Sequence, residues 1–428
     1  MILILVCVFL ILLILGVPIA ASMGLGSFVA VASQMPNALL MIPSKIFGGL
    51  DSFSLMAIPF FILAGALMDG CGISKALVDF SGLLIGWARG GLSMVVVVSS
   101  VVFAAITGSA AAATSAIGAI LIASLTAKGY EKGFSASLVA SGGMIGPIIP
   151  PSLTAVVYAS ATGVSVGALF MAGVFPGLLM GAALIINCIL YARSHPEVAV
   201  REPKKTSAQR RKIIFDAIPA VMMPVIIIGG IVSGIFTPTE SAAIACGYAI
   251  IYGVMTGKLK WDKLVNIFWD GIVSTSKLMF IIGCATLFGW ILSIKQFPAA
   301  VASFIVGITS SKWVAIALII GILLIVGCFM ENIAALNILV PILYPIGVAY
   351  GFNDIHFAMI VIMVLLYGSI TPPVGILLYI SSGIAEIRFA EAVKYIWPFL
   401  ISLFLVCIAV TLFPALTVWL PSVLGYVT

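Results

Sequence analysis

The chain has 428 residues, of which 63% are hydrophobic and 8% charged, with a formal net charge of +6. Soluble domains carry roughly 25% charged residues. Together with a mean hydropathy of +1.31, this composition excludes a soluble protein and predicts an all-α polytopic membrane protein. A transmembrane helix needs about 20 apolar residues, and segments of that length indicate about ten to twelve crossings.

Residues 1 to 44 contain no charged side chain. A cleavable signal would begin with a basic region, so we expect a retained first span. Between Arg89 and Lys128 lie 38 uncharged residues, which would form a helix of about 57 Å, nearly twice the hydrocarbon thickness. Both ends are basic, which favours a re-entrant hairpin over about residues 90–127, turning at ITGSAAA. Two ordinary short crossings are the alternative.

The next segment contains a predicted helix break. Residues 146–152 read GPIIPPS, inside a run from Gly133 to Ala192 without Asp, Glu, Lys or Arg. Adjacent prolines interrupt a helix because they lack the backbone donor. In a bilayer, the freed carbonyls must line a cavity or be covered by protein. We therefore predict a broken helix over about residues 133–160, interrupted at Pro150 and Pro151.

Residues 193–212 form the one strongly polar stretch, with seven Lys or Arg against two acids. The positive-inside rule predicts a cytoplasmic linker; a patch that binds lipid or nucleic acid is the alternative. The linker divides the chain into residues 1–192 and 213–428. We expect no nucleic-acid partner.

The two halves repeat at an offset of 222 residues, which superposes GPIIPPS on GSITPPV and the first proline pair on Pro372 and Pro373. The repeat predicts a second hairpin over about residues 313–349 and a second broken helix over about residues 355–382. Lys128 and Lys132 flank the first broken helix, whereas Asp354 flanks the second. This change of charge favours two inverted repeats, although Lys312 does not fit the pattern.

Inverted repeats with broken helices are typical of secondary transporters that bind substrate near the membrane midplane. Carbonyl and hydroxyl oxygens suit sodium, and helix N-termini suit an anionic substrate. The first predicted sodium site consists of Thr107, Gly108, Ser109, Gly143, Gly146 and Pro147. The second consists of Glu331, Asn332, Gly368, Ser369 and Thr371. We expect the substrate to contact Ser109, Thr114, Ser152 and Asn337.

Each candidate also has a plainer interpretation. Gly and Ser in membrane helices often serve close packing, and Glu331 could lie near the surface, although an acid in an apolar segment is more often functional. No phosphate loop, nucleophile elbow or histidine pair at metal-ligand spacing is present. The sequence therefore favours a transporter over an enzyme, with sodium as coupling ion and no cofactor. A channel, or a proton-coupled carrier with Glu331 as proton site, are the rival interpretations.

Five ordered motifs resemble a known family. They are LGVPIAASMGLG near the N-terminus, IPFFILAGALMDGCGI from Ile58, SGGMIGPIIPPS from Ser141, GIFTPTESAA from Gly234 and YGSITPPVG from Tyr367. Together they resemble the large membrane (M) subunit of tripartite ATP-independent periplasmic (TRAP) transporters, most of all that of sialic acid systems. One departure is Ala123, where the family pattern has proline.

The resemblance implies an elevator-type transporter of the ion transporter superfamily type, driven by sodium, in the bacterial inner membrane. It implies a small four-helix membrane subunit (Q type) and a periplasmic substrate-binding protein (P type) as partners. It places the sodium loops on the residues given above. Sialic acid is the expected substrate, with C4-dicarboxylates or another organic acid as alternatives.

Overall fold

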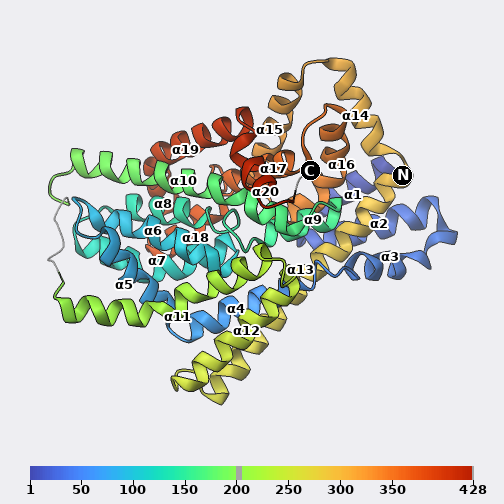
Figure 1. The fold of residues 1–428 in the computed structure, drawn as a ribbon. Coiled ribbons are helices and arrows are strands. Elements are labelled where there is room, and N and C mark those ends of the chain that lie inside the picture. Colours follow the sequence, from blue (N-terminus) through green and yellow to red (C-terminus); the bar gives the residue numbers. More distant parts are fainter. Residues whose placement is uncertain (199–204, 427–428) are drawn as a thin grey trace.

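A computed structural model describes residues 1–198 and 205–426. Residues 199–204, which belong to the predicted linker, and residues 427–428 lie outside the described part. Within the described residues the secondary structure consists of helices alone, so the all-helical prediction is confirmed for them. Figure 1 shows the helices arranged as an elongated body.

The helices fall into two sets that the linker separates. The first set contains α1 (Ile2–Ile14), α2 (Ile19–Gln34), η1 (Pro36–Ala38), α3 (Met41–Leu50), α4 (Ala57–Gly70), α5 (Ile73–Ile85), α6 (Gly91–Thr107), α7 (Ala110–Ala127), α8 (Lys132–Gly143), α9 (Leu153–Thr162) and α10 (Val166–Ser194). The second contains α11 (Ser207–Val232), α12 (Pro238–Met255), α13 (Trp261–Ile294), α14 (Phe297–Ile308), α15 (Lys312–Phe329), α16 (Asn332–Ala349), α17 (Asp354–Gly368), α18 (Ile376–Ile384), α19 (Phe389–Leu412) and α20 (Ala415–Val423).

Helix boundaries recur at the offset found in the sequence. Adding 222 to the bounds of α7 gives those of α16, and α6 and α15 correspond within one residue. The helix boundaries recur because residues that begin or interrupt a helix stand at equivalent positions of the two halves. A capping residue, Ser109 or Glu331, precedes the second hairpin helix, and a proline pair separates α8 from α9 and α17 from α18.

Seven helices of the described chain are long and apolar enough to cross a membrane, or eight if the pair α4 and α5, bent by 74°, is one span. This count of long apolar helices is lower than the ten to twelve crossings expected from the sequence. The difference arises because charge-free segments are divided into shorter apolar helices of 10–17 residues, among them α6, α9 and α17. Apolar length in a sequence does not reveal where a helix is interrupted.

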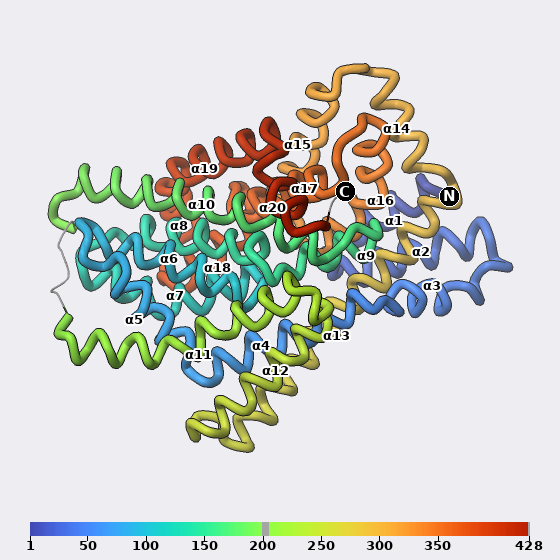
Figure 2. Tube along the Cα trace, viewed as in Figure 1, coloured from blue at the N-terminus to red at the C-terminus, as the bar shows by residue number. Residues whose placement is uncertain are grey.

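For description, we group the helices into two bodies. The arm body contains α1–α5 and α11–α14, in which α13 packs on α2, α3 and α4, whereas α14 packs mainly on α16 of the other group. The hairpin body contains α6–α10 and α15–α20. Figures 1 and 2 show hairpin 1 (α6 and α7) and hairpin 2 (α15 and α16) toward opposite ends of the view. The bodies meet where α5 packs on α6 and where α13 and α14 pack on α16.

Each broken helix contacts both hairpins in turn. Before the first break, α8 packs on α6 and α7, and after it α9 packs on α16. In the second copy, α17 packs on α15 and α16, and α18 packs on α7. The central parts of these helices are enclosed, since every residue from Gly133 to Gly143 and from Ile355 to Gly368 is buried. Both breaks therefore lie beside the tips of the two hairpins.

Candidate functional site

The two hairpin tips end in polar residues that cap a helix. The Ser109 hydroxyl accepts a hydrogen bond from the Ala112 amide at 3.4 Å. The Glu331 carboxylate accepts bonds from the amides of Ile333 at 2.9 Å and Ala334 at 3.0 Å. The first amides of a helix have no intrahelical acceptor, so these side chains satisfy them. Both tips thus present a helix N-terminus, with its partial positive charge, to the space between them.

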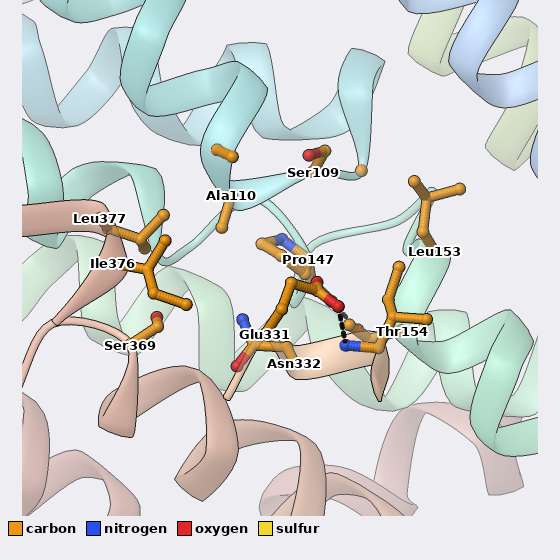
Figure 3. A pocket seen from close by; sticks show the side chains of 13 residues that line it. Ser109, Ala110, Pro147, Leu153, Thr154, Glu331, Asn332, Ser369, Ile376 and Leu377 are labelled. Atoms are coloured by element: carbon orange, nitrogen blue, oxygen red, sulfur yellow. Dashed lines mark hydrogen bonds between the residues drawn. The ribbon is translucent and has the colours of Figure 1, made fainter. Parts of the chain in front are cut away.

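A small cavity of about 60 Å³ separates the two tips. Figure 3 shows Ser109 and Ala110 on one side, Glu331 and Asn332 on the other, and Pro147 between them. Its lining comes from both hairpins and both breaks: Gly108, Ser109, Ala110, Ala111, Pro147, Leu153, Thr154, Glu331, Asn332, Ile333, Ser369, Ile376 and Leu377. Since one water takes about 30 Å³ of liquid volume, the cavity has room for an ion or one to two waters, and none for an organic acid.

The cavity unites members of both candidate sets. The residues of the first set that line it are Gly108, Ser109 and Pro147, and those of the second set are Glu331, Asn332 and Ser369. The sequence placed these residues in two separate sodium sites. The structure brings six of them to one place because each broken helix passes both hairpin tips.

The other glycines of the candidate sets lie where backbones approach closely. A Cβ at Gly143 would lie 1.9 Å from the hydroxyl oxygen of Thr114, and one at Gly368 would lie 2.5 Å from the carbonyl carbon of Gly327. A Cβ at Gly146 would lie 3.2 Å from the Ser109 carbonyl oxygen. These glycines let the broken helices touch the hairpins, and they are not among the lining residues of the small cavity.

Two threonines of the candidate sets lie outside the small cavity. The Thr107 hydroxyl donates to the Phe103 carbonyl at 3.4 Å, and the Thr371 hydroxyl donates to the Tyr367 carbonyl at 2.8 Å. Both bonds run along the residue's own chain, to the residue four positions earlier. In this structure these hydroxyls are therefore occupied within their own segments.

The Pro147 carbonyl is held by hydroxyl groups beyond the break. It accepts hydrogen bonds from the hydroxyl of Ser152 and, at 3.0 Å, from that of Thr154. Ser152 also caps α9 by accepting a bond from the Ala155 amide at 3.1 Å. Thr154 was not among the sequence candidates, although a hydroxyl just after a helix break was a usable signal.

Seven buried side-chain oxygens have no hydrogen-bond partner within the described residues, and two of them, Asn332 Oδ1 and Thr114 Oγ1, belong to the candidate residues. A buried polar atom without a partner costs about 1–3 kcal/mol, so each such atom needs an explanation. Asn332 lines the small cavity, and Thr114 lies against Gly143 behind the tip of hairpin 1. Both are oxygen atoms that a cation could use.

A larger cavity of about 440 Å³ lies beside the tips, at the boundary of the two bodies. α4 and α13 of the arm body line it together with hairpin residues that include Thr107, Ser109 and Glu331. Its charged side chains are Asp69, Lys277 and Glu331. Asp69 and Lys277 were not among the residues predicted from the sequence, although a lysine inside a long apolar helix is a recognisable signal.

The four predicted substrate contacts do not share a cavity. Ser109 lines the small and the larger cavity, whereas Asn337 lines a third, of about 710 Å³, near Lys45 and Ser160. The Asn337 amide donates to the Ile333 carbonyl at 2.9 Å. Ser152 and Thr114 are fully buried behind the small cavity.

Residues 6–416 match the family described as Tripartite ATP-independent periplasmic transporter, DctM component. The chain is 37% identical over 410 residues to the C4-dicarboxylate TRAP transporter large permease protein DctM of Pseudomonas aeruginosa, covering 94% of each. It is 35% identical over 420 residues to the Sialic acid TRAP transporter large permease protein SiaM of Vibrio cholerae, covering 97% of each.

Among solved structures, the chain is similar to the YdaH transporter of Alcanivorax borkumensis, with a TM-score of 0.64 over 89% of each chain at 13% identity. At that identity the likeness concerns the fold alone. The family match and the two permease relatives each cover nearly the whole chain. The chain therefore belongs to the DctM family of TRAP transporters, as a multi-pass protein of the inner membrane.

Proposed function

We propose that this chain takes up a small carboxylate by a sodium-coupled elevator mechanism, with sialic acid as the substrate. The observation that carries the sodium assignment is the cavity between the hairpin tips, which gathers Glu331, Asn332 and Pro147 around a volume of about 60 Å³. Sodium is a hard cation that prefers oxygen ligands, as calcium and magnesium do. The unpartnered Asn332 Oδ1 would gain a partner when the ion binds.

The packing of the broken helices supports inverted repeats. α8 lies along hairpin 1 and α9 along hairpin 2. If the broken helix α8–α9 crosses the membrane, the two hairpins occupy opposite halves of the bilayer, which means that they enter from opposite faces. The reciprocal contacts of α17 and α18 give the same arrangement for the second copy.

The division into two bodies supports the elevator mechanism. The hairpin body carries both tips and both breaks, so the sodium cavity lies within a single body. The arm body contributes α4 and α13 to the larger cavity at the boundary. A sliding of the hairpin body along α13 would carry the cavity between the tips across the membrane without taking it apart.

Sialic acid and C4-dicarboxylates both fit this arrangement. The two relatives named for them are 35% and 37% identical to the chain, so identity does not decide between the acids. Both carry carboxylates, which the N-termini of α7 and α16 would favour. We propose a small four-helix membrane subunit as scaffold partner and a periplasmic binding protein that delivers the acid.

The test is uptake into proteoliposomes that contain this chain with its small subunit. Labelled N-acetylneuraminate and labelled succinate are supplied separately, each with a binding protein that is specific for it. We expect saturable uptake of N-acetylneuraminate that requires an inward sodium gradient. Uptake of succinate alone would show that the substrate is a dicarboxylate and not sialic acid. Uptake of neither acid under a sodium gradient would overturn the proposal.

A further inference from the structure

Lys277 lies in the middle of the longest helix. α13 has 34 residues and contains a segment apolar enough to span a membrane, and Lys277 is the last charged residue before the uncharged run from Leu278 to Ile294. A charged group that borders such a run is favoured where it faces a water-filled cavity or a partner. The position of Lys277 therefore requires a compensating environment.

The larger cavity provides part of that environment. Lys277 is exposed and lines the space of about 440 Å³ together with Asp69 and Glu331. Across the described ranges, the one ion pair at bonding distance joins Arg388 to Glu391. The Asp69 carboxylate already accepts a hydrogen bond from the Ser74 hydroxyl. Lys277 thus has an unpaired ammonium beside the hairpin tips.

Packing does not explain this lysine, because its side chain is exposed. The position 222 residues earlier is Leu55, which is 1% exposed and lies in the turn between α3 and α4. The first half of the chain therefore has no ammonium at the corresponding position.

We propose that Lys277 binds the carboxylate of the transported anion in this cavity, an inference that rests on the proposed function. The cavity falls within the 300–1,000 Å³ typical of small-molecule sites, whereas the small cavity between the tips, of about 60 Å³, has room for an ion or one to two waters. The anion then touches Lys277 of the arm body and the hairpin tip at Ser109 together.

The charges of the cavity link this contact to sodium. Two carboxylates, Asp69 and Glu331, face one ammonium, so an anion meets a net negative lining. A sodium ion beside Glu331 removes that excess. Anion binding at Lys277 therefore strengthens when sodium is bound.

The test measures equilibrium binding of labelled acid to the purified permease with its small subunit, in saturating sodium. The probes are N-acetylneuraminate and succinate, each compared with the neutral analogue in which every carboxylate is replaced by a carboxamide. Lys277→Met removes the charge and keeps the length of the side chain, Lys277→Gln is a second neutral variant, and Lys277→Arg keeps the charge.

The neutral variants lose a hydrogen bond between charged groups, and we expect this loss to weaken binding of the acid about 10- to 100-fold. We expect Lys277→Arg to retain most of the affinity. The carboxamide, which lacks the charge, should bind the wild type and Lys277→Met equally weakly. Lys277→Met should not weaken sodium binding to the protein without acid, because it removes a positive charge from the lining that contains Glu331.

Three outcomes would overturn the inference. The first is wild-type affinity for the acid in both neutral variants. The second is an equal loss for acid and carboxamide, which indicates a structural role. The third is recovery of binding in Asp69→Asn combined with Lys277→Met, since Lys277 would then only neutralise Asp69. If the wild type binds neither acid in sodium, the proposed function itself fails. That result differs from the three outcomes above, in all of which the wild type binds the acid.

Discussion

Gly108 sits where hairpin 1 touches the first helix break, and Gly108→Ala tests whether that contact shapes the sodium cavity. Its φ of +60° lies in the left-handed region, which costs a residue with a Cβ about 1–2 kcal/mol. The added Cβ would lie 2.4 Å from the Pro151 carbonyl oxygen, where ordinary contact begins at 3.4 Å. The tip and the break must therefore separate by about 1 Å.

That separation would move Ser109, the next residue, relative to Pro147 across the small cavity. Binding groups need placement within about 0.5 Å, and a displacement of 1 Å can cost about 100-fold. Because the displacement is about 1 Å, we expect the half-saturating sodium concentration of Gly108→Ala to rise at least about tenfold. The measurement is sodium-dependent thermal stabilisation of the purified complex, together with sodium titration of uptake.

Gly163→Ala is the matched control. Gly163 follows α9 with a φ of +80°, and nothing lies within 4 Å of a Cβ placed there. This variant carries the same backbone strain without the steric contact, so it should lose less stability than Gly108→Ala and keep wild-type sodium affinity. If Gly108→Ala also keeps wild-type sodium affinity, the contact between tip and break does not shape an ion site.

Three further predictions address the second hairpin and the assembly. Glu331→Gln should raise the half-saturating sodium concentration about 30-fold or more, because the Glu331 carboxylate lines the small cavity and opposite charges about 4 Å apart attract by about 4 kcal/mol at an effective dielectric constant of about 20. Glu331→Ser keeps a capping oxygen and should raise that concentration as much. An unchanged sodium titration in both variants would contradict the role of the charge. Gly368→Ala, whose Cβ would lie 2.5 Å from the Gly327 carbonyl carbon, should weaken sodium binding, whereas Gly321→Ala on the same hairpin, with nothing within 4 Å, should not. Equal titrations of these two variants would refute the role of the close approach. The chain reconstituted alone should show little uptake, and robust sodium-driven uptake of free acid without partners would argue against the proposed assembly.

The sequence located the helix breaks because their chemistry is local. GPIIPPS predicted an interruption, and α8 ends at Gly143 while α9 begins at Leu153. Charges at Arg89 and Lys128 bounded the first hairpin, and the structure has α6 and α7 between them. Ser109 and Glu331 stand at the offset of the repeat, and the structure shows that each precedes the second helix of its hairpin.

The contents of the cavities could not be read from the sequence, because they depend on which helix faces meet. Asn337 lies one helical turn beyond Ile333 and reaches a different cavity, away from Ser109. The bond from Thr154 to the Pro147 carbonyl closes across the break, and no spacing rule predicts it. Lys277 was readable as an isolated charge, but its neighbours Asp69 and Glu331 come together only through the packing of α4, α13 and the hairpin tips.

The central claim is that sodium bound between the two hairpin tips drives uptake. The most direct measurement compares wild type and Glu331→Gln in proteoliposomes with the small subunit and the binding protein, under an inward sodium gradient with no proton gradient. The account predicts saturable uptake in the wild type that stops when the sodium gradient is dissipated, and a titration shifted to higher sodium in the variant. Uptake that follows a proton gradient instead, or that is independent of sodium in both proteins, would contradict it.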